Sequence, residues 1–112
     1  MTALAPSAQA CLEAWINCEN LLAEISLRQP GYAHSLEKTL DDCALMCMET
    51  WQAIKSNDPN TRNMMLLCIG LCEECADACN RYNDPFFSQC ASACRKCANR
   101  MADVSLQSVL LQ

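Results

Sequence analysis

Glycine is nearly absent from this chain, which has only Gly31 and Gly70 in 112 residues. Small secreted domains that depend on disulfides are rich in loops, and this composition does not fit them. Aromatic residues are also few, and no run of 18 apolar residues occurs, so we expect no membrane-spanning helix. No charged leader followed by an apolar stretch is visible, and we therefore expect a cytoplasmic protein.

Basic clusters and acid–base catalysts are scarce as well. The net charge is −5, and no basic stripe is present that could follow a phosphate backbone. His34 is the only histidine, so the usual acid–base pair is missing, as is the Glu-x-x-His motif of di-iron bundles. We expect neither a nucleic-acid partner nor an enzyme.

Cysteine is the residue that the chain has in excess, with eleven copies. The stretch "CIGLCEECADAC" at 68–79 spaces four of them by four, three and four residues. On a helix with 3.6 residues per turn these steps return to one side, within an arc of roughly 60°. On a strand the odd step would send later cysteines to the opposite face. The spacing therefore predicts a helix with one stripe of thiols.

Prolines divide the chain into four similar segments. Pro30 follows a long helical pattern, and Asp58–Pro59 and Asp84–Pro85 each read as an N-cap followed by the first helical residue. Four helices of similar length with short links predict an all-α, antiparallel up-down-up-down four-helix bundle. We expect one domain over residues 1–112, with helices near 7–29, 32–56, 59–82 and 85–105.

The same stripe recurs in the other three segments. Because bundle helices turn their apolar stripe inward, and cysteine behaves as a small buried hydrophobe, we expect the thiols to line the core. In the first segment, Trp15 and Leu22 stand at places where the rhythm would put cysteines. The predicted inward cysteines are Cys11, Cys18, Cys43, Cys47, Cys68, Cys72, Cys75, Cys79, Cys90, Cys94 and Cys97.

Four interpretations of these thiols are considered: core filler, disulfide staples, a single zinc or iron–sulfur site, and a set of Cu(I) ions. Cysteine as core filler does not explain eleven copies in one register, and a core of small thiols would lack volume. Two CxxxC pairs, Cys75–Cys79 and Cys90–Cys94, resemble the twin hairpins of small mitochondrial import chaperones and could staple a helical interaction protein. An odd total leaves one thiol over. Two CxxC pairs, Cys72–Cys75 and Cys94–Cys97, could hold zinc or an iron–sulfur cluster in one Cys₄ site.

Charge favours several Cu(I) ions over several zinc ions. A buried ZnS₄ site carries a net charge of −2, which is costly away from water. One Cu⁺ for each thiolate is neutral, and soft thiolates prefer Cu(I). A tube lined with ligands would then bind many ions along its axis. We expect several Cu(I) ions per chain, about one for each core cysteine, and an unidentified protein as copper donor.

Taken together, "CIGLCEECADAC", "CASACRKCANRM" and "CALMC" in a four-helix layout resemble the copper storage proteins. The resemblance covers nearly the whole chain and implies storage of Cu(I) on core thiolates, homo-tetramers of bundles, and Met and His side chains near one mouth. Candidates for these further ligands are Met64, Met101 and His34. Methionine offers a neutral soft thioether, which suits passage of Cu(I). Independently, apolar residues on a second face of the first segment predict self-association.

Overall fold

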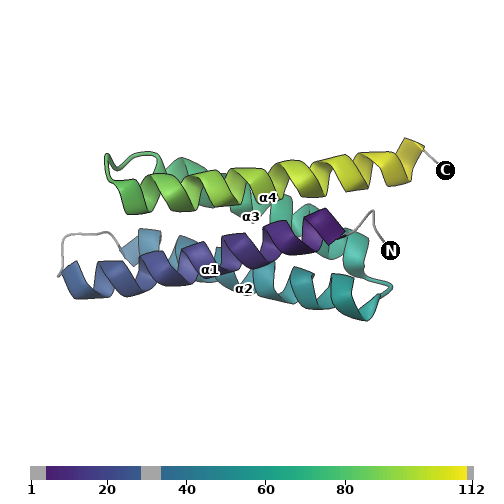
Figure 1. Ribbon diagram of the computed structural model, residues 1–112, viewed down its shortest axis with the longest axis horizontal. Coiled ribbons are helices and arrows are strands. Elements are labelled where there is room, and N and C mark those ends of the chain that lie inside the picture. The colour runs from purple at the N-terminus through teal and green to yellow at the C-terminus, as the bar shows by residue number, and fades with distance from the viewer. Residues whose placement is uncertain (1–4, 29–33, 111–112) are drawn as a thin grey trace.

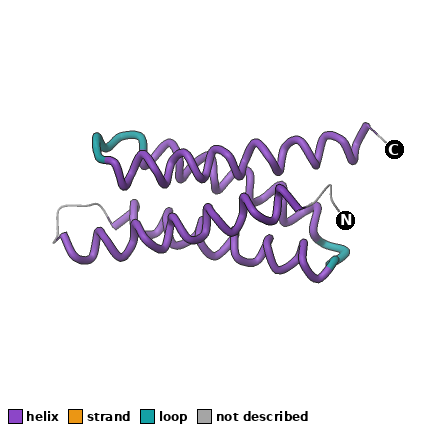
Figure 2. Tube along the Cα trace, in the orientation of Figure 1, coloured by secondary structure: helices purple, strands orange, loops and turns teal. Residues whose placement is uncertain are grey.

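Four α-helices form the chain in the computed structural model, which describes residues 5–28 and 34–110 (Figure 1). They are α1 (Ala5–Arg28), α2 (His34–Ser56), α3 (Thr61–Cys79) and α4 (Pro85–Leu110). Figure 2 shows that the described residues are helical apart from the two short links after α2 and after α3. The bundle predicted from the sequence is confirmed. The predicted helix stop at Pro30 lies outside the described residues.

Each helix packs against two neighbours around a common axis. α1 lies against α2 and α4, and α3 lies against the same two helices from the opposite side. The body measures 49 × 22 × 21 Å, so its core is a long, narrow column. The start of α1, the end of α2, the start of α3 and the end of α4 meet at one end (Figure 1).

The link from α2 to α3 differs from the capping that the sequence suggested. Asn57 adopts a left-handed conformation with φ of 57°, and the backbone N–H of Asp58 donates to the carbonyl of Ala53 at 3.0 Å, which ends α2. The Asp58 carboxylate accepts from the N–H of Asn60 at 2.7 Å. The turn absorbs Pro59, and α3 begins at Thr61 rather than at residue 59.

The link from α3 to α4 follows the predicted capping. The Asp84 carboxylate accepts a hydrogen bond from the N–H of Phe86 at 2.9 Å, and its carbonyl accepts one from Ser88 at 2.9 Å. Helix α4 thus begins at Pro85, as a proline at the first helical position favours. It continues to Leu110, five residues beyond the predicted end, whereas α3 ends at Cys79, three residues before its predicted end.

Small side chains dominate the core. Besides the cysteines, alanines such as Ala14, Ala44, Ala76 and Ala98 are buried on all four helices. Small residues at facing positions let helix backbones approach closely, so thiols from different helices can meet across the axis. Larger buried side chains stand towards the two ends of the column. Among the described residues, no helix carries an apolar stretch sufficient to cross a membrane.

Candidate metal centre

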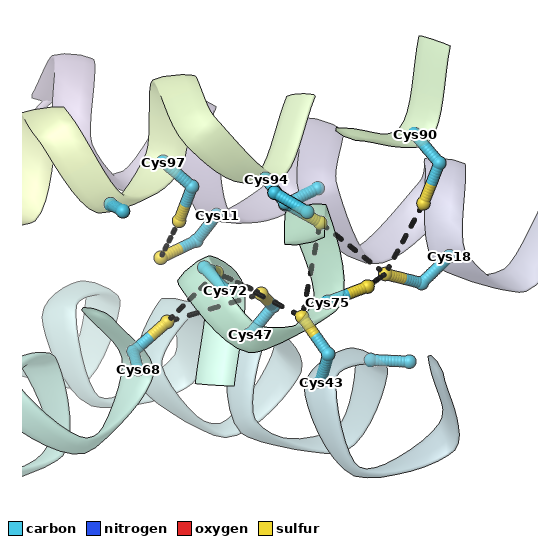
Figure 3. Packing of buried hydrophobic residues seen from close by; sticks show 14 of the residues in the cluster. Cys11, Cys18, Cys43, Cys47, Cys68, Cys72, Cys75, Cys90, Cys94 and Cys97 are labelled. Atoms are coloured by element: carbon cyan, nitrogen blue, oxygen red, sulfur yellow. Dashed lines mark hydrogen bonds between the residues drawn. The ribbon is translucent and has the colours of Figure 1, made fainter. Parts of the chain in front are cut away.

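All eleven cysteines lie within the described residues, and all are fully buried and free of disulfides. The sulfurs of the cysteines that Figure 3 labels point towards the bundle axis from all four helices. Every thiol therefore lies in the core, as the spacing of the cysteines predicted. The twin CxxxC staple has no counterpart, because Cys75, Cys79, Cys90 and Cys94 are all free thiols.

The thiols form a nearly continuous chain of contacts along the axis. At one side Cys18 is the hub: its sulfur lies 3.8 Å from those of Cys90 and Cys94 and 4.0 Å from that of Cys75. Cys43 continues the chain, with its sulfur 3.9 Å from that of Cys94 and 3.8 Å from that of Cys72. Figure 3 traces this path in dashed lines.

At the other side, three sulfurs form a closed triangle. The Cys47 sulfur lies 3.5 Å from that of Cys72 and 3.9 Å from that of Cys68, and the last two lie 3.9 Å apart. A metal at the centre of such a triangle, with bonds of about 2.3 Å as for zinc, needs sulfurs about 4.0 Å apart. The free triangle is therefore close to the size that a three-coordinate ion requires. Cys11 and Cys97 pair alongside it at 3.7 Å.

Three groups of thiols have mutual distances short enough to share metal ions. In each group the sulfurs lie within 4.8 Å of one another. Because Cys75 belongs to two of them, and Cys43 and Cys72 join the others, the groups form one extended site rather than separate sites. The groups are Cys18, Cys43, Cys75 and Cys94; Cys47, Cys68, Cys72 and Cys97; and Cys75, Cys79 and Cys90.

The short contacts mostly cross the bundle. With the exception of Cys68–Cys72, each one joins a thiol of α1 or α2 to a thiol of α3 or α4. The four cysteines of α1 and α2 therefore hold the column together. Trp15 and Leu22, expected to interrupt the α1 stripe, are only partly buried, and their neighbours Ala14 and Leu21 are buried in the core instead.

Hydrogen bonds between thiols shift their pKa values in opposite directions. The nearby Cys18 thiol is the main cause that lowers the pKa of the Cys43 and Cys94 thiols. The pKa of Cys18 is itself raised, first by the nearby Cys43 thiol, then by its other thiol neighbours, and also by burial. Burial disfavours every thiolate that has no cation beside it. Protons must therefore leave the column when a metal binds there.

One end of the column is lined by hydroxyls and thioethers, and we call it the hydroxyl end. Each of its members lies about one helical turn beyond a terminal cysteine of its own helix. All are buried, and none carries a charge. They are Ser7 on α1, Thr50 on α2, Met65 on α3 and Met101 on α4.

The opposite end, which we call the apolar end, is closed by large hydrocarbon side chains. Phe87 is fully buried and stacks on Tyr82, with ring centroids 4.6 Å apart. Leu21 and Leu40 are almost equally buried, and each stands three residues beyond the outermost cysteine of its own helix towards this end, Cys18 and Cys43 respectively. Two further core residues, Ile25 and Leu36, lie one turn beyond them. Beyond the thiols of Cys79 and Cys90, the buried described residues of this end offer no soft or polar side chain to an ion on the axis.

The three predicted accessory ligands have different surroundings. Met101 is fully buried at the hydroxyl end, one turn beyond Cys97. Met64 is half-buried, whereas its neighbour Met65 is in the core. His34 is exposed in a shallow surface depression with Leu22, Glu37, Lys38 and Asp41, at the apolar end. The structure therefore brings Met101 towards the thiols, but it does not bring His34 to them.

Sequence reasoning missed the hydroxyls and chose Met64 over Met65. The signal was present: Ser7 stands four residues before Cys11, Thr50 three after Cys47, and Met65 three before Cys68. Steps of three and of four both lie on the same helix face. Extending each cysteine stripe by one turn would have found all three residues.

Known proteins match this chain over nearly all of its length. A family model described as "Copper storage protein" matches residues 1–105. The cysteine-rich protein YhjQ of Bacillus subtilis strain 168, described as uncharacterized, is 26% identical over 97 residues, covering 82% of this chain and 90% of that protein. The solved structure of the Cu(I)-bound copper storage protein BsCsp3 superposes with a TM-score of 0.87 at 20% identity, covering 93% of this chain and 99% of that one. With the family model matched across almost the whole bundle, this chain belongs to the copper storage protein family.

Proposed function

We propose that the chain stores several Cu(I) ions on its eleven core thiolates. The observation that carries this is the nearly continuous chain of buried free thiols along the axis, drawn from all four helices. Storage is the function after which the family is named, and the solved relative is described as Cu(I)-bound. Such a site has no need of a substrate pocket or an acid–base pair, so no catalytic role is proposed.

Charge decides for Cu(I) over zinc, because the distances suit both. A tetrahedral zinc site with bonds of about 2.3 Å needs sulfurs about 3.8 Å apart, as several pairs here are. Two adjoining ZnS₄ sites would however place a charge of −4 in a core without a buried cation among its described residues. One Cu⁺ for each thiolate leaves the column neutral. We therefore expect a capacity of about one Cu(I) per cysteine.

The Met residues fit the role of accessory ligands near the hydroxyl end. A thioether binds Cu(I) without releasing a proton, so an ion can rest there before it reaches the thiols. Met101 is the first candidate because of its burial, and Met64 stays a candidate from the half-buried first turn of α3. His34 also stays a candidate, but only for an ion bound at the surface.

Two wider expectations concern assembly and compartment. Large apolar side chains are exposed on all four helices, including Ile16 on α1, Leu45 on α2, Leu67 on α3 and Phe86 on α4. They support self-association, with a homo-tetramer as first choice, and light scattering at micromolar concentration tests it. Eleven free thiols persist best in a reducing compartment, which supports a cytoplasmic location. The copper donor stays unidentified.

An anaerobic titration with mass readout tests the function. Reduced, metal-free protein is titrated with Cu(I), and the bound ions are counted by native mass spectrometry. We expect several Cu(I) per chain, rising towards one per cysteine, together with about eleven reactive thiols in the unfolded apo-protein. Saturation at a single ion, or displacement of bound Cu(I) by an equal amount of Zn²⁺, would contradict the proposal.

A further inference from the structure

Three hydroxyl side chains are the only buried polar side chains in the described part of the chain. Ser7, Thr50 and Ser105 are 1%, 0% and 7% exposed, respectively. None of their side-chain oxygens has a hydrogen-bond partner among the described residues. All three belong to the same end of the bundle, the hydroxyl end. A buried hydroxyl without a partner is costly, so three at one place require an explanation.

Register places two of these hydroxyls in the layer of the core next to the last thiols. The sulfurs of Cys47, Cys68 and Cys97 lie within 4.8 Å of one another, and that of Cys11 lies 3.7 Å from that of Cys97. At a rise of 1.5 Å per residue, Thr50 stands about 4.5 Å beyond Cys47 along α2. By the same rule, Ser7 stands about 6 Å beyond Cys11 along α1. Both hydroxyls therefore form the next layer of the core.

The same layer is completed by thioethers, and Ser105 leads outward from it. Met65 and Met101 stand at this level on α3 and α4, and neither offers a hydrogen-bond donor. Ser105 follows Met101 by one turn on the same face of α4. The hydroxyls thus lead from the layer beside the outermost thiols towards the end of the bundle. Unpartnered buried hydroxyls are groups that ordered water molecules commonly satisfy.

Copper storage, on which the next step rests, releases protons inside this core. As Cu⁺ forms its bond to a cysteine sulfur, the S–H bond breaks and the sulfur keeps the electron pair. One proton leaves for each ion bound, no electron is transferred, and the site stays neutral. Among the described core residues, no carboxylate, histidine or lysine is buried that could accept this proton.

We propose that Ser7, Thr50 and Ser105 form a hydrated proton exit at the hydroxyl end of the thiol column. A hydroxyl can accept a proton from one neighbour while it donates its own to the next, and bound water links the three to solvent. The proton passes from the thiol at Cys11 or Cys47 to this layer and then to bulk water. At the apolar end, by contrast, the fully buried side chains of Leu21, Leu40 and Phe87 carry no exchangeable proton.

Exchange of the thiol protons in the metal-free protein tests the exit without any copper. The reduced full-length chain is transferred to D₂O, and the loss of the S–H stretching band is followed by infrared spectroscopy. We expect Thr50→Val, which keeps the shape but removes the hydroxyl, to slow this exchange roughly threefold to tenfold, the factor of one hydrogen bond of ordinary net strength. Ser7→Ala combined with Thr50→Val should slow it further.

Two variants separate the relay from a change in packing. Thr50→Ser restores a hydroxyl without the methyl group and should exchange at the rate of the unchanged chain. Thr39→Val makes the same replacement on the same helix, where the hydroxyl is exposed and donates to the Ser35 carbonyl, and should have no effect. Equally fast thiol exchange in Thr50→Val and in the double variant overturns the proposal. So does a slowing that the backbone amides of α2 share in equal measure.

A second experiment measures proton release during copper binding. The unchanged chain and Thr50→Val are each mixed with Cu(I) and a pH indicator in a stopped-flow instrument. We expect one proton for each bound ion in both proteins, released more slowly by Thr50→Val. If the chain binds no Cu(I), the proposed storage function fails, while the infrared experiment still decides on the exit. If copper-driven proton release is equally fast in both proteins, the exit has no part in loading and the proposal is overturned.

Discussion

The two ends of the thiol column are built from opposite materials. At the apolar end, Phe87, Leu21 and Leu40 close the axis with hydrocarbon and leave no unsatisfied polar atom among the described residues. At the hydroxyl end, Ser7 and Thr50 stand in the corresponding layer, and their buried side-chain oxygens have no hydrogen-bond partner among the described residues. The four-helix bundle therefore differs chemically from one end of its axis to the other.

The difference shows where the fold gets its stability. A core of cysteine and alanine gives small gains per residue, because burial energy scales with apolar area. The largest buried side chain, Phe87, stands at the apolar end. We therefore expect the apolar end to hold the apo-bundle together and the hydroxyl end to serve exchange with solvent. The four predictions below test this division.

The largest effect should come from truncating the apolar end. Phe87→Ala removes a fully buried ring that stacks on Tyr82, and we expect a loss of about 3–5 kcal/mol in the free energy of unfolding. Phe86→Ala is the matched control: this ring is 44% exposed and should cost much less. Urea unfolding of the reduced, metal-free chain followed by circular dichroism measures both. Equal losses in the two variants would show that the buried Phe87 ring does not stabilise the bundle more than an exposed one.

Copper capacity should be more sensitive near the apolar end than near the hydroxyl end. Cys18→Ser removes a thiol whose sulfur contacts those of Cys75, Cys90 and Cys94, whereas Cys11→Ser removes one that contacts only Cys97 at short range among the described residues. We expect Cys18→Ser to lose more bound Cu(I) per chain, by native mass spectrometry after anaerobic titration. If Cys11→Ser abolished binding, a single cooperative cluster would replace the extended column.

The two interhelical links give a smaller contrast. Asp84 caps α4 by accepting from the N–H of Phe86, and Asp84→Ala should cost about 1 kcal/mol. Asp58 accepts from Asn60 inside the turn and caps no helix directly, so Asp58→Ala should cost less. Thermal unfolding of both variants in parallel measures the difference. A larger loss in Asp58→Ala would mean that the turn at the hydroxyl end, rather than the cap at the apolar end, stabilises the helix pair.

The smallest effect should be on stability at Thr50. If water satisfies the buried hydroxyl, Thr50→Val exchanges one favourable environment for another, and the free energy of unfolding should change by less than about 1 kcal/mol. A dry hydroxyl would instead make the valine variant more stable by about 1–3 kcal/mol. Chemical unfolding of Thr50→Val beside Thr39→Val measures which applies. A large gain at Thr50 alone would mean that the hydroxyl end is dry.

Much of the fold and of the thiol site could be predicted from the sequence, because both follow from helical periodicity. Steps of three and four residues put cysteines on one face, and each of the eleven is buried. The N-cap at Asp84 could be predicted because the fixed φ of Pro85 suits the first position of a helix. Asp58 and Pro59 form the same Asp-Pro dipeptide as Asp84 and Pro85. The left-handed conformation of Asn57, however, starts a turn that moves the start of α3 to Thr61.

What could not be predicted depends on how each helix is rotated about its own axis, which decides which of two adjacent residues faces the core. Positions three and four away from a cysteine both face inward on an isolated helix, so packing decides between Met64 and Met65. On α1 it also selects Ala14 over Trp15, whose ring lies 6.3 Å from that of Trp51 instead. The narrow axis favours the small side chain. Spacing alone contains no information on this width.

Phe87, Leu21 and Leu40 close one end of the thiol column with hydrocarbon. If copper enters at the opposite, hydroxyl end, ions would fill the column from the closed end upward and would leave in the reverse order. Copper deposited beside Cys79 and Cys90 would then form a long-lived reserve, while copper beside Cys11 and Cys97 would form a quickly available one. A single small protein could in this way keep two pools of the same metal that differ only in depth.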